Sequence, residues 1–418
     1  MTKTKLSKTT WRGFVAYCLE NSQIALIVVP TLGAKIASLV YKPSGREWLW
    51  SNPYSTVKQA KHGDCYTDKF DLGGWDECFP SVAKTTYPES PWEGAAIGDH
   101  GEIWSQAWQT EIISENGTNA LKMVANGVSL PYRFERTIAI SENEKTVSFK
   151  YAVENLSEHD MPFIWSSHPV FAVEPGMKLS FPTQEMTVYS SIGDRFGKLG
   201  DKHTWPEITE TRAESETRTE AGVGSDCKTE SRAAATNKKY DLSVLPDLDA
   251  GYALKLYGAA PAAGEVSLAA PLSGDNLTFS FDPNQITHLG LWLNFNGWSG
   301  LDDGTTYYNL AIEPAIGAQD DLALAYKRFD EYGKVPAKQT VSWNLDVTLS
   351  GEKMNESSEH EDEMCIENEV KEDGRLLTYY HFRTPDAVKE SKGAVSKGAA
   401  TKDGKDKSAK KTKQAEAK

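Results

Sequence analysis

The side chains best suited to proton transfer stand in short polar interruptions of apolar runs. His168 lies in "FIWSSHPVFAVEPG" (residues 163–176), between two serines and a proline, in a run with the composition of a β-strand. Pro169 has no N–H to give to a sheet ladder, so strand pairing weakens where the imidazole stands. Histidine has the unperturbed pKa closest to neutrality, which suits acid–base chemistry. Taken alone, His168 also fits a core histidine that hydrogen-bonds to backbone carbonyls.

A carboxylate and a second histidine extend this set. Glu313 follows an apolar run in "YYNLAIEPAIGAQDDLALA" and precedes a proline. A carboxylate at a strand end, partly removed from water, has its pKa raised toward the range useful for taking a proton. The alternative is a rim glutamate paired with an arginine. His100 follows Asp99, which supports the charged imidazolium, whereas His100 with Glu102 is too few ligands for zinc. We expect no metal and no cofactor.

Aromatic side chains point to a class of ligand. The chain has 12 tryptophans, and five clusters set them beside polar residues: "REWLW", "GGWDECFP", "HGEIWSQAW", "FIWSSHP" and "LGLWLNFNGW". Sugar rings stack on flat apolar faces while their hydroxyls need fixed hydrogen-bonding partners, so we expect Trp292 and Asp76 to contact a sugar. The alternative is an ordinary sandwich core. Asp76 and Glu77 also supply the two carboxylates that a glycosidase would use.

The elements around these residues are predominantly β-strands. From residue 11 to about 350, short runs rich in Val, Ile, Thr, Phe and Tyr alternate with turn signals such as "ENGT" and "SENEK", which predict antiparallel hairpins. One helix is expected in "QDDLALAYKRF", capped by Asp320 or Asp321. Many strands without βαβ alternation predict an all-β fold, a large sandwich or barrel.

Two segments interrupt the body in residues 1–350 or follow it. Residues 207–239 are almost free of large apolar groups and predict a low-complexity insertion that lacks stable structure. Residues 351–418 form a charged tail that we expect to be largely disordered, acidic first and then lysine-rich. A polybasic motif for nucleic acid or membrane is the alternative for its end. The "RLLTYYHFR" segment is apolar enough to dock on the body.

Charge and cysteine content exclude some partners. The net charge of −14 argues against a general nucleic-acid or anionic-membrane surface. No apolar run approaches the roughly 20 residues of a membrane helix, and no apolar stretch follows the charged N-terminus as in a signal peptide. The five cysteines, at 18, 65, 78, 227 and 365, are odd in number and scattered. We therefore expect reduced thiols and a cytoplasmic protein.

The ordered motifs "P-x-LGAKIASL", "GREWLW", "GGWDECFP", "DHGEIW", "SHPVF" and "LAIEPAIGAQDDLALA" resemble the aldose 1-epimerase (galactose mutarotase-like) superfamily, in a divergent branch. The resemblance covers about residues 11–350 without the insertion. It implies a β-supersandwich of two large, mostly antiparallel sheets. It also implies a mutarotase that interconverts the α and β anomers of a free sugar.

The resemblance implies a role for each matching residue. His168 corresponds to the acid that protonates the ring oxygen, Glu313 to the base that takes the anomeric proton, and His100 to a residue that hydrogen-bonds the sugar. Asp249, in "LPDLDAGYALKLY", corresponds to an aspartate that holds sugar hydroxyls, although the nearby insertion obscures the match. We expect acid and base on opposite sides of the sugar, about one ring apart, and a bell-shaped pH dependence.

One departure from the family concerns substrate charge. Relatives that bind hexose 6-phosphates carry an arginine soon after the first histidine, whereas this chain has Glu102. A carboxylate there would repel an anion, so we expect a neutral aldose to be preferred. If the phosphate ester were preferred, Arg133 or Arg136 would have to supply the anion site. The alternative function is a catalytically silent carbohydrate-binding relative of the mutarotases.

Overall fold

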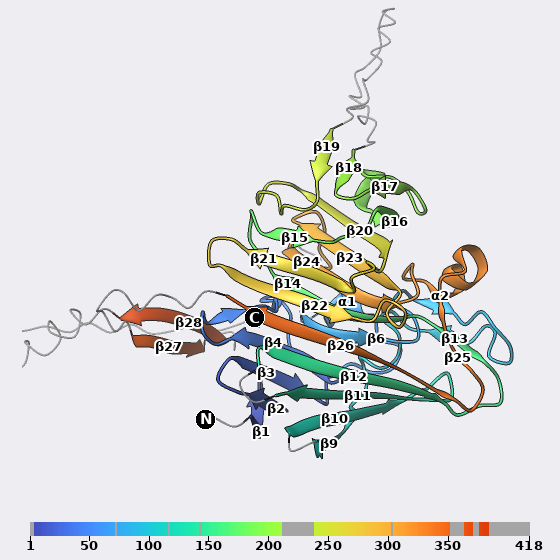
Figure 1. The fold of residues 1–418 in the computed structure, drawn as a ribbon, viewed down its shortest axis with the longest axis horizontal. Coiled ribbons are helices and arrows are strands. Elements are labelled where there is room, and N and C mark those ends of the chain that lie inside the picture. The colour runs from blue at the N-terminus through green and yellow to red at the C-terminus, as the bar shows by residue number, and fades with distance from the viewer. Residues whose placement is uncertain are drawn as a thin grey trace, which may run out of the picture. The chain divides into compact units, whose positions relative to one another are not determined.

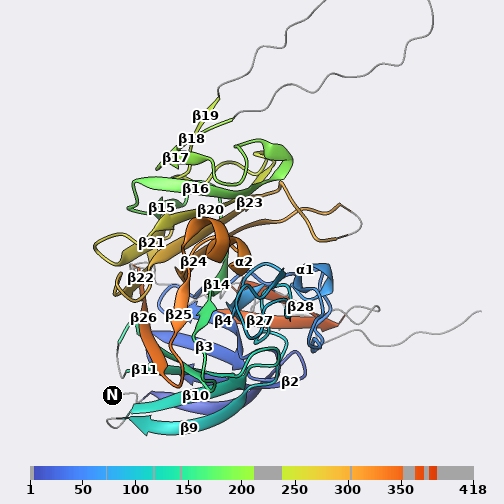
Figure 2. The ribbon, with the colours of Figure 1, turned by 90° about the vertical axis from the view of Figure 1, so that its right-hand side faces the viewer.

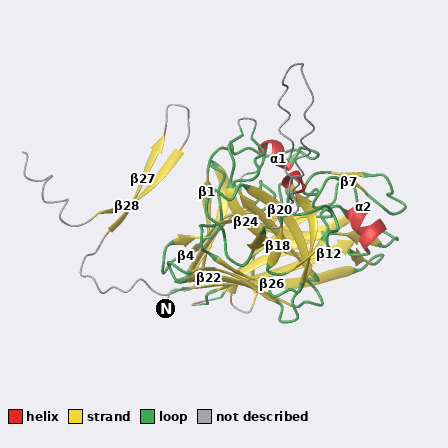
Figure 3. Cartoon of the chain, turned by 90° about the horizontal axis from the view of Figure 1, so that it is seen from above, coloured by secondary structure: helices red, strands yellow, loops and turns green. Residues whose placement is uncertain are grey.

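The computed structural model describes residues 4–71, 73–115, 118–141, 144–210, 238–301, 304–351, 363–370 and 376–383. The chain divides into two compact units, Met1–Met354 and Asn355–Lys418. Almost all regular structure in the first unit is β-strand, as Figure 3 shows by its colours. No helix among the described residues is long and apolar enough to cross a membrane.

The first unit is built on a 12-stranded sheet. Its strands, in order across the sheet, are β1 (Lys5–Trp11), β2 (Phe14–Glu20), β3 (Ile24–Val29), β4 (Lys35–Tyr41), β6 (Gly74–Cys78), β14 (Trp165–Ala172), β24 (Tyr308–Ile316), β23 (His288–Phe295), β20 (Tyr252–Ala259), β16 (Glu185–Ser191) and β17 (Lys202–Thr204), with β5 (Arg46–Glu47) beside β4. All the neighbouring pairs are antiparallel.

The second sheet of this unit has eight strands. They are β15 (Lys178–Ser180), β21 (Glu265–Ala270), β22 (Asp275–Phe281), β26 (Thr340–Ser350), β12 (Thr146–Asn155), β11 (Tyr132–Ile140), β10 (Thr118–Asn126) and β9 (Gln109–Glu115). The long strands β26, β12, β11 and β10 run side by side in Figure 1. The predicted hairpins at "ENGT" and "SENEK" are confirmed, since β9 pairs with β10 and β11 with β12.

The core lies between the two sheets. Trp75 of β6 contacts Phe149 of β12 at a ring-centroid distance of 4.8 Å, and Trp165 of β14 contacts Trp343 of β26 at 4.9 Å. All four rings are buried. Alternate residues of each strand face this core because side chains in a strand alternate between the two faces of the sheet. The prediction of two large antiparallel sheets with a shared core is therefore confirmed.

Short elements complete the unit. They are α1 (Tyr66–Lys69), the 3₁₀-helix η1 (Ile192–Asp194), α2 (Leu322–Leu324), the π-helix η2 (Ala325–Phe329), and the two-stranded pairs β7 (Thr85–Thr86) with β8 (Ala96–Ile97) and β13 (Met161–Phe163) with β25 (Gly333–Val335). The helix predicted in "QDDLALAYKRF" is present. Of the two candidate caps, Asp321 is the one that accepts from the backbone N–H groups of Ala323 and Leu324, at 2.8 and 3.1 Å.

The boundaries of the predicted insertion were too wide. β18 (Glu207–Thr209) pairs with β19 (Lys239–Asp241), so both ends of the 207–239 segment belong to a strand ladder. Ile208 is buried and anchors this ladder. β18 and β19 lie at the end of the unit opposite β9 and β10 (Figures 1 and 2). The remainder of the insertion, 211–237, lies outside the described residues.

The second unit contains one antiparallel hairpin, β27 (Glu363–Val370) with β28 (Leu376–Arg383). This hairpin lies in the charged tail that we expected to be largely disordered. The last eight residues of the apolar segment "RLLTYYHFR" form the whole of β28. The rest of the tail, including its lysine-rich end at 384–418, lies outside the described residues.

Candidate active site

The floor of the candidate site is the face of the larger sheet that points away from the core. Three successive cross-strand rows run over β14, β24, β23 and β20. The middle row is Val170, Ala311, Trp292 and Lys255, and the row beside it contains Asn309 and Asn294. Because alternate residues share one face of a strand, these rows present their side chains together.

The third row contains the predicted acid–base pair. Ser166 pairs with Ala315 and Val170 with Ala311, so the same antiparallel register sets His168 opposite Glu313. No pairing occurs between these two points, where Pro169 on β14 and Pro314 on β24 each lack an N–H. The weakened pairing expected at His168 is therefore present, and the ladder between β14 and β24 opens inside a continuous strand.

Glu313 is completely buried, in contrast to the strand-end position predicted for it. Its Oε2 accepts from Lys255 Nζ at 2.5 Å and from Ser166 Oγ at 3.1 Å. Its Oε1 has no hydrogen-bond partner among the described residues and lies 3.6 Å from His168 Nε2. One oxygen thus anchors the carboxylate while the other faces the imidazole.

Gly290 of β23 lies next to Glu313 in this row. A Cβ at position 290 would lie 3.1 Å from the Tyr257 ring and 3.2 Å from Glu313 Cβ, closer than ordinary van der Waals contact. A larger side chain at position 290 would therefore require Tyr257 or Glu313 to shift by a few tenths of an ångström. Glycine gives Glu313 and Tyr257 room to approach each other across β23.

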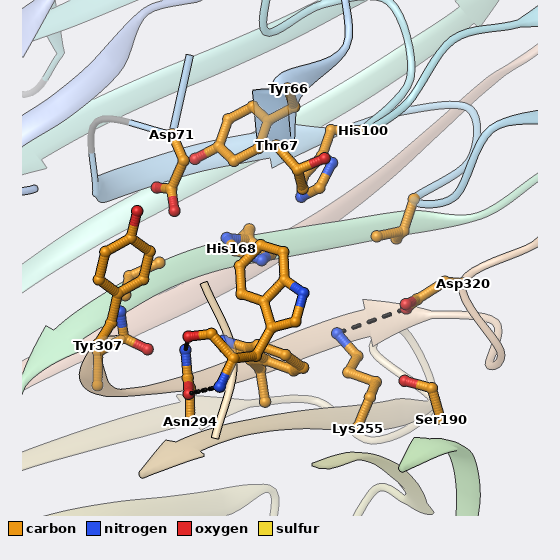
Figure 4. Close-up of a pocket in the computed structure, with 15 residues that line it drawn as sticks. Tyr66, Thr67, Asp71, His100, His168, Ser190, Lys255, Asn294, Tyr307 and Asp320 are labelled. Atoms are coloured by element: carbon orange, nitrogen blue, oxygen red, sulfur yellow. Dashed lines mark hydrogen bonds and ion pairs between the residues drawn. The ribbon is translucent and has the colours of Figure 1, made fainter. Parts of the chain in front are cut away.

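Lys255 links the buried pair to the opening of the site. Its Nζ lies 2.5 Å from Glu313 and 3.4 Å from Asp320 Oδ1, and Asp320 also accepts from Tyr257 OH. Burial disfavours the charge on Lys255, but the two carboxylates outweigh it and raise its pKa. The ammonium is therefore a fixed positive charge between two carboxylates, and Figure 4 shows its ion pair with Asp320.

His100 reaches the site from a loop that packs against the backbone of residues 79–82, which follow β6. His100 has a left-handed backbone (φ 60°), which histidine tolerates better than most side chains. Gly101, also at positive φ, allows this close approach, because a Cβ there would lie 2.2 Å from the Phe79 carbonyl oxygen. The N–H of His100 donates to the Val82 carbonyl at 2.6 Å.

Asp99 connects this loop to α1. Its Oδ1 pairs with His100 Nδ1 at 3.1 Å, and its Oδ2 accepts from the backbone N–H of Tyr66 at 3.1 Å. The Tyr66 ring stacks on His100 at a centroid distance of 4.0 Å. Asp99 thus fixes His100 and Tyr66 as one face of the site.

The two histidines differ in charge although their ring centroids are only 5.2 Å apart. Burial, together with the nearby charges of His100 and Lys255, lowers the pKa of His168 to about 3. Burial opposes the charge on His100 as well, but its ion pair and hydrogen bond with Asp99 raise its pKa. Burial alone would raise the pKa of Asp99, but its ion pair and hydrogen bond with His100 outweigh this effect and lower the pKa to about 2. At neutral pH His168 is uncharged, and His100 carries most of the imidazolium character of the site.

These groups surround a cavity of about 160 Å³ (Figure 4). His100, His168, Lys255 and Asp320 reach its surface, and its aromatic lining consists of Tyr66, Trp292, Trp298 and Tyr307. Trp292 and Trp298 meet edge to face at 5.8 Å. Aromatic faces next to hydroxyl-binding polar groups are the usual surroundings of a bound sugar ring.

The structure brings together some of the predicted site residues. His168, His100 and Trp292 line the cavity, and Glu313 lies directly behind His168. Their spacing differs from the expectation, because a distance of 3.6 Å is far shorter than a sugar ring. The expectation was wrong for a chemical reason: the anomeric oxygen and the ring oxygen are bonded to the same carbon, so groups that act on them are neighbours.

Asp76 and Asp249 were placed wrongly. Asp76 is buried under the site, where it binds Lys35 and accepts from Tyr66 OH at 2.8 Å, so it supports the cavity wall and does not line it. Asp249 is exposed in the turn before β20 and is not part of the cavity lining. Lys255, six positions later, is the residue of this segment that reaches the cavity.

The glycosidase alternative is excluded because successive side chains of β6 face opposite sides of the sheet. Asp76 faces the site, whereas Glu77 faces the core and binds Arg136 at 2.9 Å and Trp165 Nε1 at 2.8 Å. Adjacent strand residues point to opposite faces of a sheet, so the two carboxylates cannot flank one bond. Arg136 is likewise fully buried in the core and is not available to an anionic substrate.

Glu102 is also turned away from the cavity. It is fully buried and accepts from the backbone N–H groups of Val128 and Ser129 and from Tyr132 OH, at 3.1, 2.9 and 2.9 Å. The argument that Glu102 repels a phosphate in the site was therefore wrong. Its role is to hold the 128–129 turn.

Sequence patterns missed several residues of the site. The tryptophans of these clusters were a weak guide: Trp48, Trp75 and Trp165 lie in the core, and of the clustered tryptophans that the structure describes only Trp292 and Trp298 line the cavity. Lys255 carries the clearest missed signal, since it is the one charged residue in the apolar strand "YALKLYGA". Asp320 was considered only as a helix cap. Among the described residues no three His, Cys, Asp or Glu side chains are grouped so as to hold a metal ion.

Comparisons with known proteins give matches at the level of structure. No protein-family model and no curated protein matches the sequence. The structure is similar to a galactose mutarotase-like protein from Clostridium acetobutylicum (10% identity, 84% of this chain and 99% of the other, TM-score 0.54). It is also similar to a galactose mutarotase related enzyme from Lactobacillus acidophilus (13%, 81% and 98%, TM-score 0.52).

A candidate aldose 1-epimerase from Escherichia coli K12 matches to a similar extent, with 13% identity, 81% of this chain and 99% of the other, and a TM-score of 0.54. Identities this low establish the fold alone. The chain has the galactose mutarotase-like fold, and the resemblance stated from the sequence motifs is confirmed at that level.

Proposed function

We propose that this protein is a mutarotase-like isomerase that interconverts the α and β anomers of a free sugar. One observation carries the proposal: His168 Nε2 and Glu313 Oε1 lie 3.6 Å apart beside an aromatic cavity, and Glu313 Oε1 has no other partner among the described residues. His100 lies beside this pair, with its ring centroid 5.2 Å from that of His168, so a base and an acid stand close enough to serve two neighbouring oxygens on one carbon, O1 and the ring oxygen.

The reaction exchanges two protons and breaks one bond. Glu313 Oε1 takes the proton of the anomeric hydroxyl while an acid gives a proton to the ring oxygen. The C1–O5 bond breaks, and O1 becomes the oxygen of an aldehyde. After rotation about C1–C2, the reverse transfers close the ring on its other face. Each positioned acid or base contributes about 10²–10⁴-fold to the rate.

We assign the acid to His100. Burial opposes its charge, but its ion pair with Asp99 raises its pKa and its ring reaches the cavity, so it holds a proton to a higher pH than His168 does. His168, with a pKa of about 3, is a neutral hydrogen-bonding partner between His100 and Glu313. This exchanges the roles that the family resemblance implied for the two histidines.

A neutral sugar remains the proposed substrate, for a new reason. Five carboxyl groups lie at or directly beneath the cavity, against three cationic side chains: Asp71, Asp76, Asp99, Glu313 and Asp320 against Lys35, His100 and Lys255. Lys35, His100 and Lys255 are each already paired with a carboxylate. In this inner cavity an added phosphate would meet only cations that are already paired, so it would lose hydration without gaining a new partner there. The free thiols of Cys18, Cys65 and Cys78 support a reducing compartment such as the cytoplasm.

A catalytically silent sugar-binding protein is the second candidate. It is favoured by the anchoring of Glu313, which is fully buried and bound by Lys255 and Ser166. A binder could use the aromatic cavity without any proton transfer from this carboxylate.

Polarimetry over a panel of free aldoses, combined with ligand titration by NMR, separates the two candidates. The isomerase speeds the approach to anomeric equilibrium for at least one sugar that it binds. A protein that binds sugars and leaves their mutarotation at the buffer rate is the silent relative. A protein that binds no sugar contradicts both.

A further inference from the structure

A second cavity of about 330 Å³ adjoins the candidate active site. The two cavities share Thr67, Asp71 and Tyr307 in their linings, so they form one continuous cleft. The inner cavity, about 160 Å³, is below the ~300–1,000 Å³ typical of larger small-molecule sites, whereas the two together fall within that range. A single sugar ring at His168 would leave the outer cavity empty.

The outer cavity has an aromatic side. Tyr54 is 55% exposed, and its ring lies nearly parallel to that of Tyr307, at an interplanar angle of 16° and a centroid distance of 6.4 Å. The backbone N–H of Tyr54 donates to Asn52 Oδ1 at 3.0 Å, which fixes the loop that carries the ring. An exposed aromatic face held in this way provides a stacking surface for an apolar ring face.

Polar groups lie where the two cavities meet. Asp71 Oδ1 accepts from the backbone N–H of Gly73 at 3.0 Å, which fixes the carboxyl group at the junction. Figure 4 shows the Asp71 carboxyl turned toward the space between Tyr66 and Tyr307. Thr67 lines both cavities and adds a hydroxyl. A carboxyl and a hydroxyl at the junction suit a ligand rich in hydroxyl groups.

We propose that the outer cavity is a second sugar subsite, so that the preferred ligand is a reducing disaccharide. Its reducing ring occupies the cavity at His168, and its second ring stacks on Tyr54 beside Tyr307. The junction hydroxyls of the disaccharide bind Asp71 and Thr67. This inference rests on the proposed function for the identity of the inner ligand, but the subsite itself can be tested by binding alone.

The test compares glucose with maltose, cellobiose and lactose, which end in the same reducing ring. Anomer exchange is measured by NMR for each sugar, and affinity is measured by titration. At least one disaccharide is expected to have a lower KM and Kd than glucose with a similar kcat, since the second ring binds far from the reacting carbon. Tyr54→Ala should raise both constants for that disaccharide about two- to tenfold and leave glucose unchanged.

Leu272→Ala is the control, because Leu272 is 91% exposed in the turn between β21 and β22, and this variant should change neither sugar. If no disaccharide binds better than glucose, or if Tyr54→Ala affects glucose and the disaccharide equally, the subsite is refuted while the isomerase proposal stands. If sugars bind but no exchange is catalysed, the isomerase proposal fails. The binding ratio between disaccharide and glucose then still decides the subsite.

Discussion

His100 and His168 should respond to pH with opposite signs although they lie side by side. The pKa of His168 is about 3 in the folded protein against about 6.5 for an unperturbed histidine. Unfolding therefore takes up a proton as the pH falls below 6.5, and the stability contributed by uncharged His168 is lost in that range. The pKa of His100 is raised, so its contribution is present below 6.5 and is lost as the pH rises through the folded value.

The size of the His168 effect follows from its shift. When the pH falls from 7.5 to 5.0, a histidine with a pKa of about 3 in the folded state and about 6.5 in the unfolded state lowers the unfolding free energy by about 2 kcal/mol. His168→Asn keeps a side chain of similar shape without this titration. The stability of wild type relative to His168→Asn should therefore fall by about 2 kcal/mol over this interval. The stability of wild type relative to His100→Asn should rise.

Urea unfolding at pH 7.5 and 5.0 measures both differences, and the remaining histidines cancel because all three proteins contain them. NMR of the imidazole carbons gives the two pKa values directly. The reasoning is refuted if the two differences change in the same direction, or if His168 titrates near pH 6.5 in the empty protein.

Three further predictions concern the same network. Lys255→Met should lower the unfolding free energy by about 3–5 kcal/mol in urea titrations, since it leaves the fully buried Glu313, and Asp320 at the cavity surface, without their cation; unchanged stability would contradict the ion-pair assignment. Gly290→Ala should slow anomer exchange while sugar affinity is retained, because the new Cβ would displace Glu313; an equal exchange rate would show that Glu313 need not hold this position. The kcat/KM of wild type should fall as the pH rises through the pKa of His100; a fall already complete near pH 4 would instead identify His168 as the acid.

Local sequence patterns predicted where strands and a helix form, but not the register in which distant strands pair. Turn residues and β-rich runs located the hairpins, and the acidic pair before "LALAYKRF" located a helix start that Asp321 caps. The proline neighbours of His168 and Glu313 correctly drew attention to both. That the two residues are opposite each other depends on the register of β14 with β24, which is set by packing between residues far apart in sequence.

The misplaced residues share a physical cause. Asp76 and Glu77 are adjacent, and which of them faces the site depends on the phase of β6, which a five-residue strand buried on both faces does not reveal. Glu102 and Lys255 show the same difficulty: a charged residue in an apolar context can face a site or be satisfied internally. Which of the two applies depends on the partners of the side chain in the folded protein. Glu102 is bound by Ser129 and Tyr132, away from the cavity, whereas Lys255 is bound by Glu313 and Asp320 at the cavity.

The central claim is that Glu313 exchanges a proton with the anomeric hydroxyl of a bound sugar. The most direct test is exchange NMR of the α and β anomeric signals with wild type and Glu313→Gln, at sugar concentrations that saturate both. The amide retains the shape of the side chain and removes its basicity. Wild type should accelerate exchange above the buffer rate, and Glu313→Gln should lower the catalysed rate by about 10²–10⁴-fold with sugar affinity preserved. A Glu313→Gln protein that exchanges anomers as fast as wild type would contradict the claim.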